Sequence, residues 1–281
     1  MSKFRIIPKL DIKGPNLVKG IKLEGLRALG KPSSFAKLYY EDNADELIFQ
    51  DVVASLYDRN SLDDIISQVA KEIFIPLTVG GGIRSILDIE KILRNGADKV
   101  SINTAATKNP QLIRESALEF GSSTICVAIE VIKKQNGFGV FVDNGREDTN
   151  IDAIEWLKQV QDLGAGEILV TSVDYEGVKK GINKNLIEEI HKLVRVPVIY
   201  HGGITSVEDV KFIYDAGFNG AAIASLFHYR MIDNVLDTNH DPIEGNFSYA
   251  RKSSMSNNKF ITMKISDMKS ELITHGVQVR R

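Results

Sequence analysis

The sequence predicts a single (β/α)8 barrel, the TIM-barrel class of α/β fold, and three observations support this prediction. Eight short runs rich in β-branched and other apolar residues follow one another along the chain. Amphipathic segments with helical periodicity lie between most of these runs, which is the pattern of a parallel sheet. The chain of 281 residues also has room for eight such units, since a barrel of this class needs roughly 250 residues.

The predicted strands are short apolar runs, and in chain order they are residues 4–12, 45–53, 75–81, 98–102, 124–132, 166–173, 196–202 and 220–225. The predicted helices have apolar residues three and four positions apart. They are residues 61–73, 86–96, 109–121, 152–164, 185–194 and 206–217. After the fifth strand, residues 137–145 predict a small hairpin excursion.

An internal repeat supports the barrel. The segment "DELIFQD…IPLTVGGGIRS" aligns with "GEILVTS…VPVIYHGGITS", and matched residues lie 121 positions apart, as Gly96 does from Gly217. We therefore expect one domain over residues 1–281, built from half-barrels near 1–120 and 121–230. A polar insertion at about 234–259 precedes the last predicted helix, and we expect it on the same face as the active site.

The composition excludes several functional classes. The net charge of −2 favours neither nucleic acid nor a membrane surface as a partner. A single cysteine allows no internal disulfide, and no segment is apolar for long enough to span a membrane. We expect a cytoplasmic protein. No His, Cys or Asp cluster has metal-ligand spacing, so neither a metal nor a cofactor is predicted.

Acidic residues end several of the predicted strands, where barrels place their catalytic groups. They are Asp11, Asp51, Glu130 and, just after the sixth strand, Glu176. Asp11 and Glu130 end strands that are equivalent under the repeat. Two carboxylates that face each other across a barrel mouth can serve as general acid and general base. We therefore predict Asp11 as the acid and Glu130 as the base.

Two glycine-rich loops at symmetric positions predict phosphate sites, because backbone N–H groups and helix N-termini bind anions. Residues 79–85 with 101–106 would form one site, and residues 201–206 with 222–227 would form the other. The glycine pairs Gly81–Gly82 and Gly202–Gly203 correspond in the repeat. Opposed sites indicate a substrate that carries a phosphate at each end.

These motifs resemble one known family, the cyclase subunit of imidazole glycerol phosphate synthase. The resemblance rests on "RIIPKLDIK", "NLVKG", "DELIFQD", "TVGGGI", "GADKVSINTAA", "GAGEILVTSVD" and "ASLFHYR", and it resumes in the tail at "LITHGVQVR". It implies a barrel that receives ammonia from a glutaminase subunit in a heterodimer. With that ammonia the barrel converts a bisphosphorylated ribulosyl-formimino-AICAR to imidazole glycerol phosphate and AICAR, a step of histidine biosynthesis.

The resemblance also implies roles for individual residues. Asp11 matches the catalytic aspartate of the first strand, and Lys19 matches a lysine of the flexible loop that follows it. A ring of salt-bridged charges at the N-terminal end of the barrel, through which ammonia would enter, corresponds to Arg5, Glu46, Lys99 and Glu167, with Asp98 facing the partner beside it. The substrate-binding positions that we predict are Asp51, Gly81, Gly82, Asn103, Thr104, Thr171, Glu176, Gly177, Gly202, Gly203, Ala224 and Ser225.

The chain departs from the family pattern at the predicted catalytic face. Glu130 and Glu176 stand where the family has aspartate, and Lys9 stands where it usually has cysteine. The extra methylene of Glu130 moves its carboxylate by about 1 Å and adds a rotatable bond, so we expect a poorly held base that Glu130→Asp would improve. These departures leave one alternative open: a paralogue that relays ammonia from a glutaminase for acetamidino modification of a surface sugar.

Overall fold

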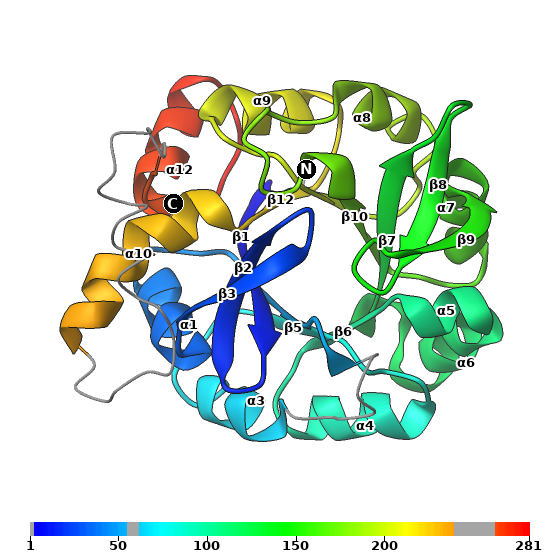
Figure 1. Ribbon diagram of the computed structural model, residues 1–281, viewed down its shortest axis with the longest axis horizontal. Coiled ribbons are helices and arrows are strands. Elements are labelled where there is room, and N and C mark those ends of the chain that lie inside the picture. The colour runs from blue at the N-terminus through cyan, green and yellow to red at the C-terminus, as the bar shows by residue number, and fades with distance from the viewer. Residues whose placement is uncertain (1–2, 55–61, 239–261) are drawn as a thin grey trace.

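The computed structural model describes residues 3–54, 62–238 and 262–281. Eight parallel strands close into a barrel whose axis lies near the line of sight in Figure 1. Hydrogen-bonded pairing runs from each strand to the next and returns from the last strand to the first. The strands are β1 (Arg5–Lys13), β4 (Leu47–Asp51), β5 (Leu77–Gly80), β6 (Lys99–Ile102), β7 (Ile125–Lys133), β10 (Glu167–Ser172), β11 (Val198–His201) and β12 (Gly220–Ile223). The predicted fold class is confirmed.

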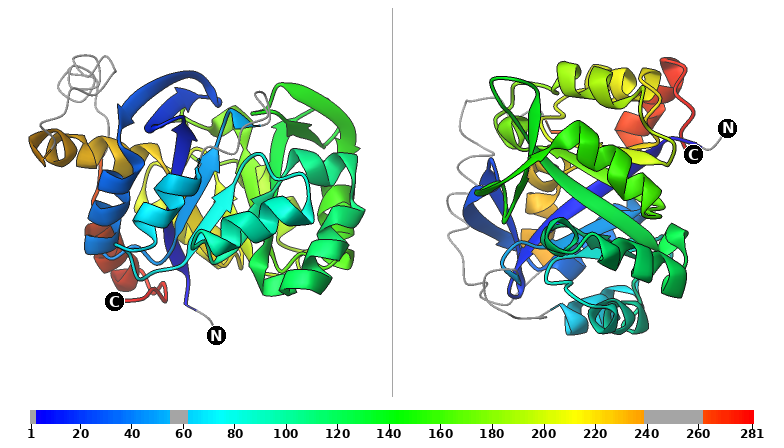
Figure 2. Two further views of the ribbon diagram at one scale, coloured as in Figure 1. Left: turned by 90° about the horizontal axis from the view of Figure 1, so that it is seen from below. Right: turned by 90° about the vertical axis from the view of Figure 1, so that its right-hand side faces the viewer.

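Two antiparallel hairpins extend the barrel at the end opposite to the N-terminus, as the left view of Figure 2 shows. The predicted excursion after the fifth barrel strand is confirmed as β8 (Phe138–Val142) and β9 (Glu147–Asp152). The segment after β1, expected to be a loop, instead forms the hairpin of β2 (Asn16–Ile21) and β3 (Glu24–Gly30). Its turn residues Lys22 and Leu23 have φ of 51° and 63°. Positive φ at both central positions gives a turn whose twist suits a tight hairpin, so Lys19 lies in a strand and not in a loop.

Helices surround the barrel in Figure 1 and bury one apolar stripe each against the strands. Each of the six predicted helices is present: α3 (Asp63–Val69), α4 (Ile86–Arg94), α6 (Gln111–Phe120), α7 (Ala153–Asp162), α8 (Lys184–Ile190) and α9 (Val207–Asp215). The sequence did not predict α1 (Pro32–Glu41) and the short α5 (Thr104–Lys108). Two single turns of 3-10 helix, η1 (Ser122–Thr124) and η2 (Val173–Tyr175), also lie in the described connections.

The last two helices change the bounds of the predicted polar insertion. Helix α10 (Ser225–Thr238) continues through residues 234–238, which the sequence had assigned to the polar insertion. The rest of that insertion, residues 239–259, lies outside the described residues, so its place on the catalytic face stays a prediction. The final helix, α12 (Ile265–Thr274), leads to a tail that pairs with the start of the chain through a bridge between Phe4 and Val279.

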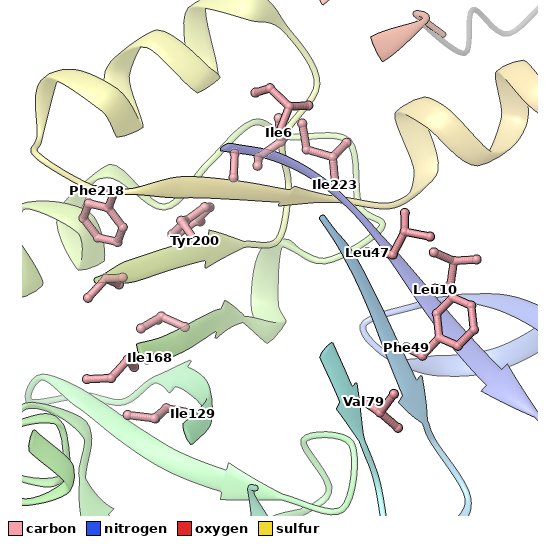
Figure 3. Close-up of a cluster of buried hydrophobic side chains, with 14 of the residues drawn as sticks. Ile6, Leu10, Leu47, Phe49, Val79, Ile129, Ile168, Tyr200, Phe218 and Ile223 are labelled. Carbon is pink, nitrogen blue, oxygen red and sulfur yellow. The ribbon is translucent and has the colours of Figure 1, made fainter. Parts of the chain in front are cut away.

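Strand alternation divides the core into two parts. The large core lies between the strands and the helices, and Figure 3 shows part of it, including Ile6, Leu10 and Leu47. A smaller apolar cluster comes from the opposite face of the strands, inside the barrel. Its members are Ile7, Ile48, Cys126, Ala128, Leu169, Ile199 and Ala222. The barrel is therefore a packed body whose two open ends hold its polar groups.

Residues paired by the internal repeat have matching backbone geometry. Gly81 and Gly202 have φ of 102° and 109° at the ends of equivalent strands. Ser85 and Ser206 each cap the following helix by accepting from the backbone N–H three residues later. The boundaries of the two half-barrels stay a prediction. No helix in the described part of the chain has the length and apolar character that crossing a membrane requires.

Candidate active site

Asp11 lies near the end of β1 and is buried, and its partner is a second buried side chain of the same strand. The ammonium of Lys9 forms an ion pair with Oδ1 of Asp11. Because side chains two residues apart in a strand point to the same side, both lie on the face that carries Ile7 of the inner cluster. The predicted acid is thus paired with Lys9, a position at which the chain departs from the family pattern.

Glu130, the predicted base, lies in β7 and is held by two neighbouring segments. Its Oε1 accepts from Nδ2 of Asn103 at 3.0 Å, and its Oε2 accepts from the backbone N–H of Gly145 at 2.7 Å. Burial raises the pKa of Glu130 to about 7; the Gly145 hydrogen bond and Lys9 lower it in part, while Asp11 and Asp143 raise it. A carboxyl group with this pKa exchanges protons near neutral pH, as a general base requires.

Lys19 and Glu176 form a second buried ion pair, with 2.5 Å between Nζ of Lys19 and Oε1 of Glu176. Nε2 of His201 lies 3.4 Å from the same oxygen, and Nδ1 of His201 is 2.9 Å from the carbonyl oxygen of Ala222. Burial alone would raise the pKa of Glu176, but Lys19 and His201 hold it well below its usual range. Glu176 is therefore a fixed anion that anchors the β2–β3 hairpin over the mouth.

Asp51 has a structural contact as well as a place at the mouth. Its Oδ1 accepts from the backbone N–H groups of Val53 and Ala54, both at 3.0 Å, which caps the turn after β4. It also lines the cavity described next. Thr171, another predicted substrate residue, is buried in β10 beside Glu130 of β7 and His201 of β11.

The first predicted phosphate site is an open cavity of about 160 Å³ between the loops after β5 and β6. A Cβ at Gly81 would lie 2.4 Å from the carbonyl oxygen of Asp51, so this position requires glycine. Two basic residues, Arg84 and Lys108, line the cavity and were not predicted. The first lies within the quoted glycine-rich motif, which was a usable signal. The predicted residues that the cavity brings together are Asp51, Gly81, Gly82, Asn103, Thr104 and Glu130.

The second predicted phosphate site is smaller, about 40 Å³, and lies at the start of α10. A Cβ at Gly203 would lie 2.1 Å from the carbonyl oxygen of Gly181. Lys179 and His201 also line this site and supply groups that favour an anion. The predicted residues that it brings together are Glu176, Gly177, Gly202, Gly203, Ala224 and Ser225.

Four charged side chains form a ring at the other end of the barrel. Arg5 forms ion pairs with Glu46, at 2.8 Å, and with Glu167. Lys99 lies 2.7 Å from a carboxylate oxygen of each of the same two residues. Asp98 is exposed beside the ring and accepts from the backbone N–H of Leu77 at 2.8 Å. The structure thus brings the predicted ring residues together, with both cations shared by both anions.

No group of three or more His, Cys, Asp or Glu side chains within residues 3–54, 62–238 and 262–281 could hold a metal ion. The site is instead built from carboxylates, lysines and backbone N–H groups.

Comparisons with known proteins show the family to which the chain belongs. The family described as "Histidine biosynthesis protein" matches residues 5–233. The imidazole glycerol phosphate synthase subunit HisF of Legionella pneumophila is 52% identical over 74% of this chain and 99% of its own length. The subunits of the same name from Lactococcus lactis subsp. cremoris (strain SK11) and Thermobifida fusca are 47% and 46% identical, over 80% and 81% of this chain and 88% and 91% of theirs. The chain belongs to the histidine biosynthesis protein family.

Proposed function

We propose that this chain is the cyclase subunit of an imidazole glycerol phosphate synthase and acts in histidine biosynthesis. The observation that carries the proposal is the pair of glycine cradles on equivalent loops of one mouth. A substrate with a phosphate at each end would span them and lie over the carboxylates between. Relatives that cover most of the chain and share the name of that subunit support the assignment.

In this proposal Asp11 is the acid, Glu130 is the base, and Lys19 closes the mouth beside the second cradle. The pKa of Glu130 near 7 supports its role, because an effective base titrates close to the working pH. The two ends of the substrate would be held by the first cradle, with Asn103 and Thr104, and by the second, at the start of α10.

The partner would be a glutaminase that docks on the N-terminal face and delivers ammonia through the charge ring. The ring supports this because ion pairing inside a barrel gains little stability over apolar packing. Each cation of the ring forms ion pairs with both carboxylates. The ring therefore lies between bulk solvent and the apolar cluster inside the barrel. Asp98 would contact the partner at the rim. Placement of the complex in the cytoplasm stays a prediction.

The sugar-amidination alternative is not favoured. It drew on the replacements at Glu130 and Glu176 and on the polar insertion. The glutamates are nevertheless held by specific contacts within the mouth, and the relatives reported above share the name HisF.

The experiment uses the purified chain, synthetic bisphosphate substrate and two sources of ammonia. We expect turnover with ammonium alone, and with glutamine once the glutaminase of the same organism is added. Lys99→Met should lower glutamine-driven turnover at least tenfold and leave ammonium-driven turnover within twofold. Lys91→Met is the matched control, because Lys91 pairs with Asp63 on the outer helices at 2.6 Å. Absence of any turnover with ammonium would refute the cyclase assignment, and equal effects of both variants would refute the ring as an ammonia entrance.

A further inference from the structure

Lys9 is a buried cation inside the barrel, and the activity proposed above does not use it. Its side chain is 5% exposed and that of its partner Asp11 is 2% exposed. Arg5, Ile7, Lys9 and Asp11 alternate along β1 and share the face that points into the barrel. Lys9 therefore lies between the apolar inner cluster and the acidic mouth.

A buried lysine is costly unless it is paired and hydrogen-bonded. Lys19 and Lys269 are also buried, and each forms an ion pair with one carboxylate, Glu176 and Asp45 respectively. Lys9 differs from them in its ion-pair partner, which is the proposed acid. It contacts Asp11 directly, and its charge also acts on Glu130 of β7. It thus acts on both carboxylates of the proposed acid–base pair, on Asp11 by direct contact and on Glu130 through its charge.

We propose that Lys9 is a positioning residue of this pair: its ammonium holds the Asp11 carboxylate and supplies the positive charge that allows Asp11 and Glu130 to share one mouth of the barrel. This inference rests on the proposed function for its kinetic consequences, but not for its electrostatic ones. Lys9 acts through Asp11 and Glu130.

The charges around Glu130 predict the direction in which its pKa shifts when Lys9 or Asp11 is replaced. Burial raises the pKa of Glu130, Lys9 lowers it, and Asp11 and Asp143 raise it. Arg84 and Lys108 line the same cavity from the loop after β5 and from α5, and Asp51 lines it from the end of β4. Asp51, Arg84 and Lys108 are unchanged in each of the Lys9 and Asp11 variants, so they do not contribute to differences between them. Removal of Lys9 should therefore raise the pKa of Glu130, and removal of the Asp11 charge should lower it.

The test is a titration of Glu130 by infrared difference spectroscopy of the whole protein, with the band assigned by its loss in Glu130→Gln. We expect Lys9→Met to move the midpoint upward by about half a pH unit or more, and Asp11→Asn to move it downward. Lys9→Arg, which retains the charge, should keep the wild-type midpoint. Lys9→Gln replaces Lys9→Met if the latter does not fold.

Lys269→Met is the matched control, because it removes an equally buried ion pair far from the mouth; Lys269 lies 2.7 Å from Asp45. It should lower the melting temperature and leave the Glu130 midpoint unchanged. If Lys9 has a purely structural role, Lys9→Met should also lower the melting temperature and leave the Glu130 midpoint unchanged. Shifts of the midpoint in the same direction in Lys9→Met and Asp11→Asn would likewise indicate a structural role. Either result overturns the proposal.

Kinetics supply a second measurement. With saturating ammonium, Lys9→Met should lower kcat at least tenfold with little change in KM for the bisphosphate, and should move the acid limb of the pH profile upward. Lys9→Arg should recover most of kcat. An inactive wild type would refute the proposed function while the infrared titration still decides the role of Lys9. An active Lys9→Met with an unshifted pH profile would refute the role of Lys9 alone.

Discussion

The backbone N–H of Gly145 donates a hydrogen bond to Oε2 of Glu130 at 2.7 Å. This contact joins the hairpin β8–β9 to the middle of a barrel strand. Because Asn103 donates to the other carboxylate oxygen at 3.0 Å, the side chain of Glu130 is fixed at both oxygens. The longer side chain is therefore held by two hydrogen bonds, while its expected weakness as a base stays a prediction.

We expect Glu130→Asp to lower ammonium-driven turnover by about tenfold to 100-fold, the reverse of what the sequence alone suggested. The shorter side chain withdraws the carboxylate by about 1 Å and loses the Gly145 hydrogen bond. Loss of that bond should also cost about 1 kcal/mol of unfolding free energy. Steady-state kinetics and urea denaturation measure the two effects. A rise in turnover would show that the Gly145 contact does not position the base.

The pH dependence of stability gives an independent test of Glu130. Burial raises its folded pKa from 4.5 to about 7, so between these values the folded protein binds more protons than the unfolded chain. Stability therefore falls as pH rises through that interval. Glu130→Gln is neutral throughout, so we expect it to be more stable than the wild type by about 1–2 kcal/mol at pH 8. The difference should shrink toward pH 5, and denaturation at both pH values measures it.

A constant difference between Glu130→Gln and the wild type at the two pH values would show that Glu130 does not titrate in this range. The same titration predicts that wild-type ammonium-driven turnover falls as pH drops below about 7, because the base becomes protonated.

The strands and most helices could be predicted because their residue patterns are local. The run from Ile125 to Ile132 is apolar apart from Glu130, and no other element type accommodates it so well. Helix α1 was missed although Pro32 at its first position is a usual signal of a helix start. The β2–β3 hairpin was missed because its turn has Lys22 and Leu23 at positive φ, where glycine or asparagine is usual.

The hydrogen-bond and ion-pair partners of the site residues could not be predicted, because they come from tertiary contacts that no local sequence pattern shows. Gly145 reaches Glu130 only because the hairpin folds back over the mouth. The Lys9–Asp11 pair was the exception, since residues two apart in a strand share a face. That spacing was visible in the sequence and would have predicted the ion pair.

Two glycines with nearly equal backbone angles allow the second phosphate site to be tested. Gly203 has φ of 81° and Gly217 has φ of 83°. A Cβ at Gly203 would lie 2.1 Å from the carbonyl oxygen of Gly181, whereas a Cβ at Gly217 would have no heavy atom within 4 Å. Both alanine variants should lose about 1 kcal/mol or more through the strained φ. Only Gly203→Ala should also weaken binding of the bisphosphate, by about tenfold, in calorimetric titrations. Equal binding by both variants would place the phosphate elsewhere.

The last prediction concerns the stability that the buried ion pair of Lys19 and Glu176 contributes. Removal of one partner leaves a buried charge unpaired, so Lys19→Met and Glu176→Gln should each lower the unfolding free energy at pH 7 by about 3 kcal/mol or more. The double variant removes both charges and should be less destabilised than the sum of the single variants. Urea denaturation of the wild type, the two single variants and the double variant measures this coupling.

The pH dependence of the same pair separates a charge effect from a packing effect. Because Lys19 and His201 hold the folded pKa of Glu176 below its ordinary value of 4.5, the pair contributes stability above that pH, and the contribution is lost as pH falls below it. The wild type should therefore lose stability below about pH 4.5 more steeply than Glu176→Gln, which has no carboxylate to protonate. Parallel stability curves for the wild type and Glu176→Gln would mean that the side chain contributes through packing, and that the hairpin is not held over the mouth by charge.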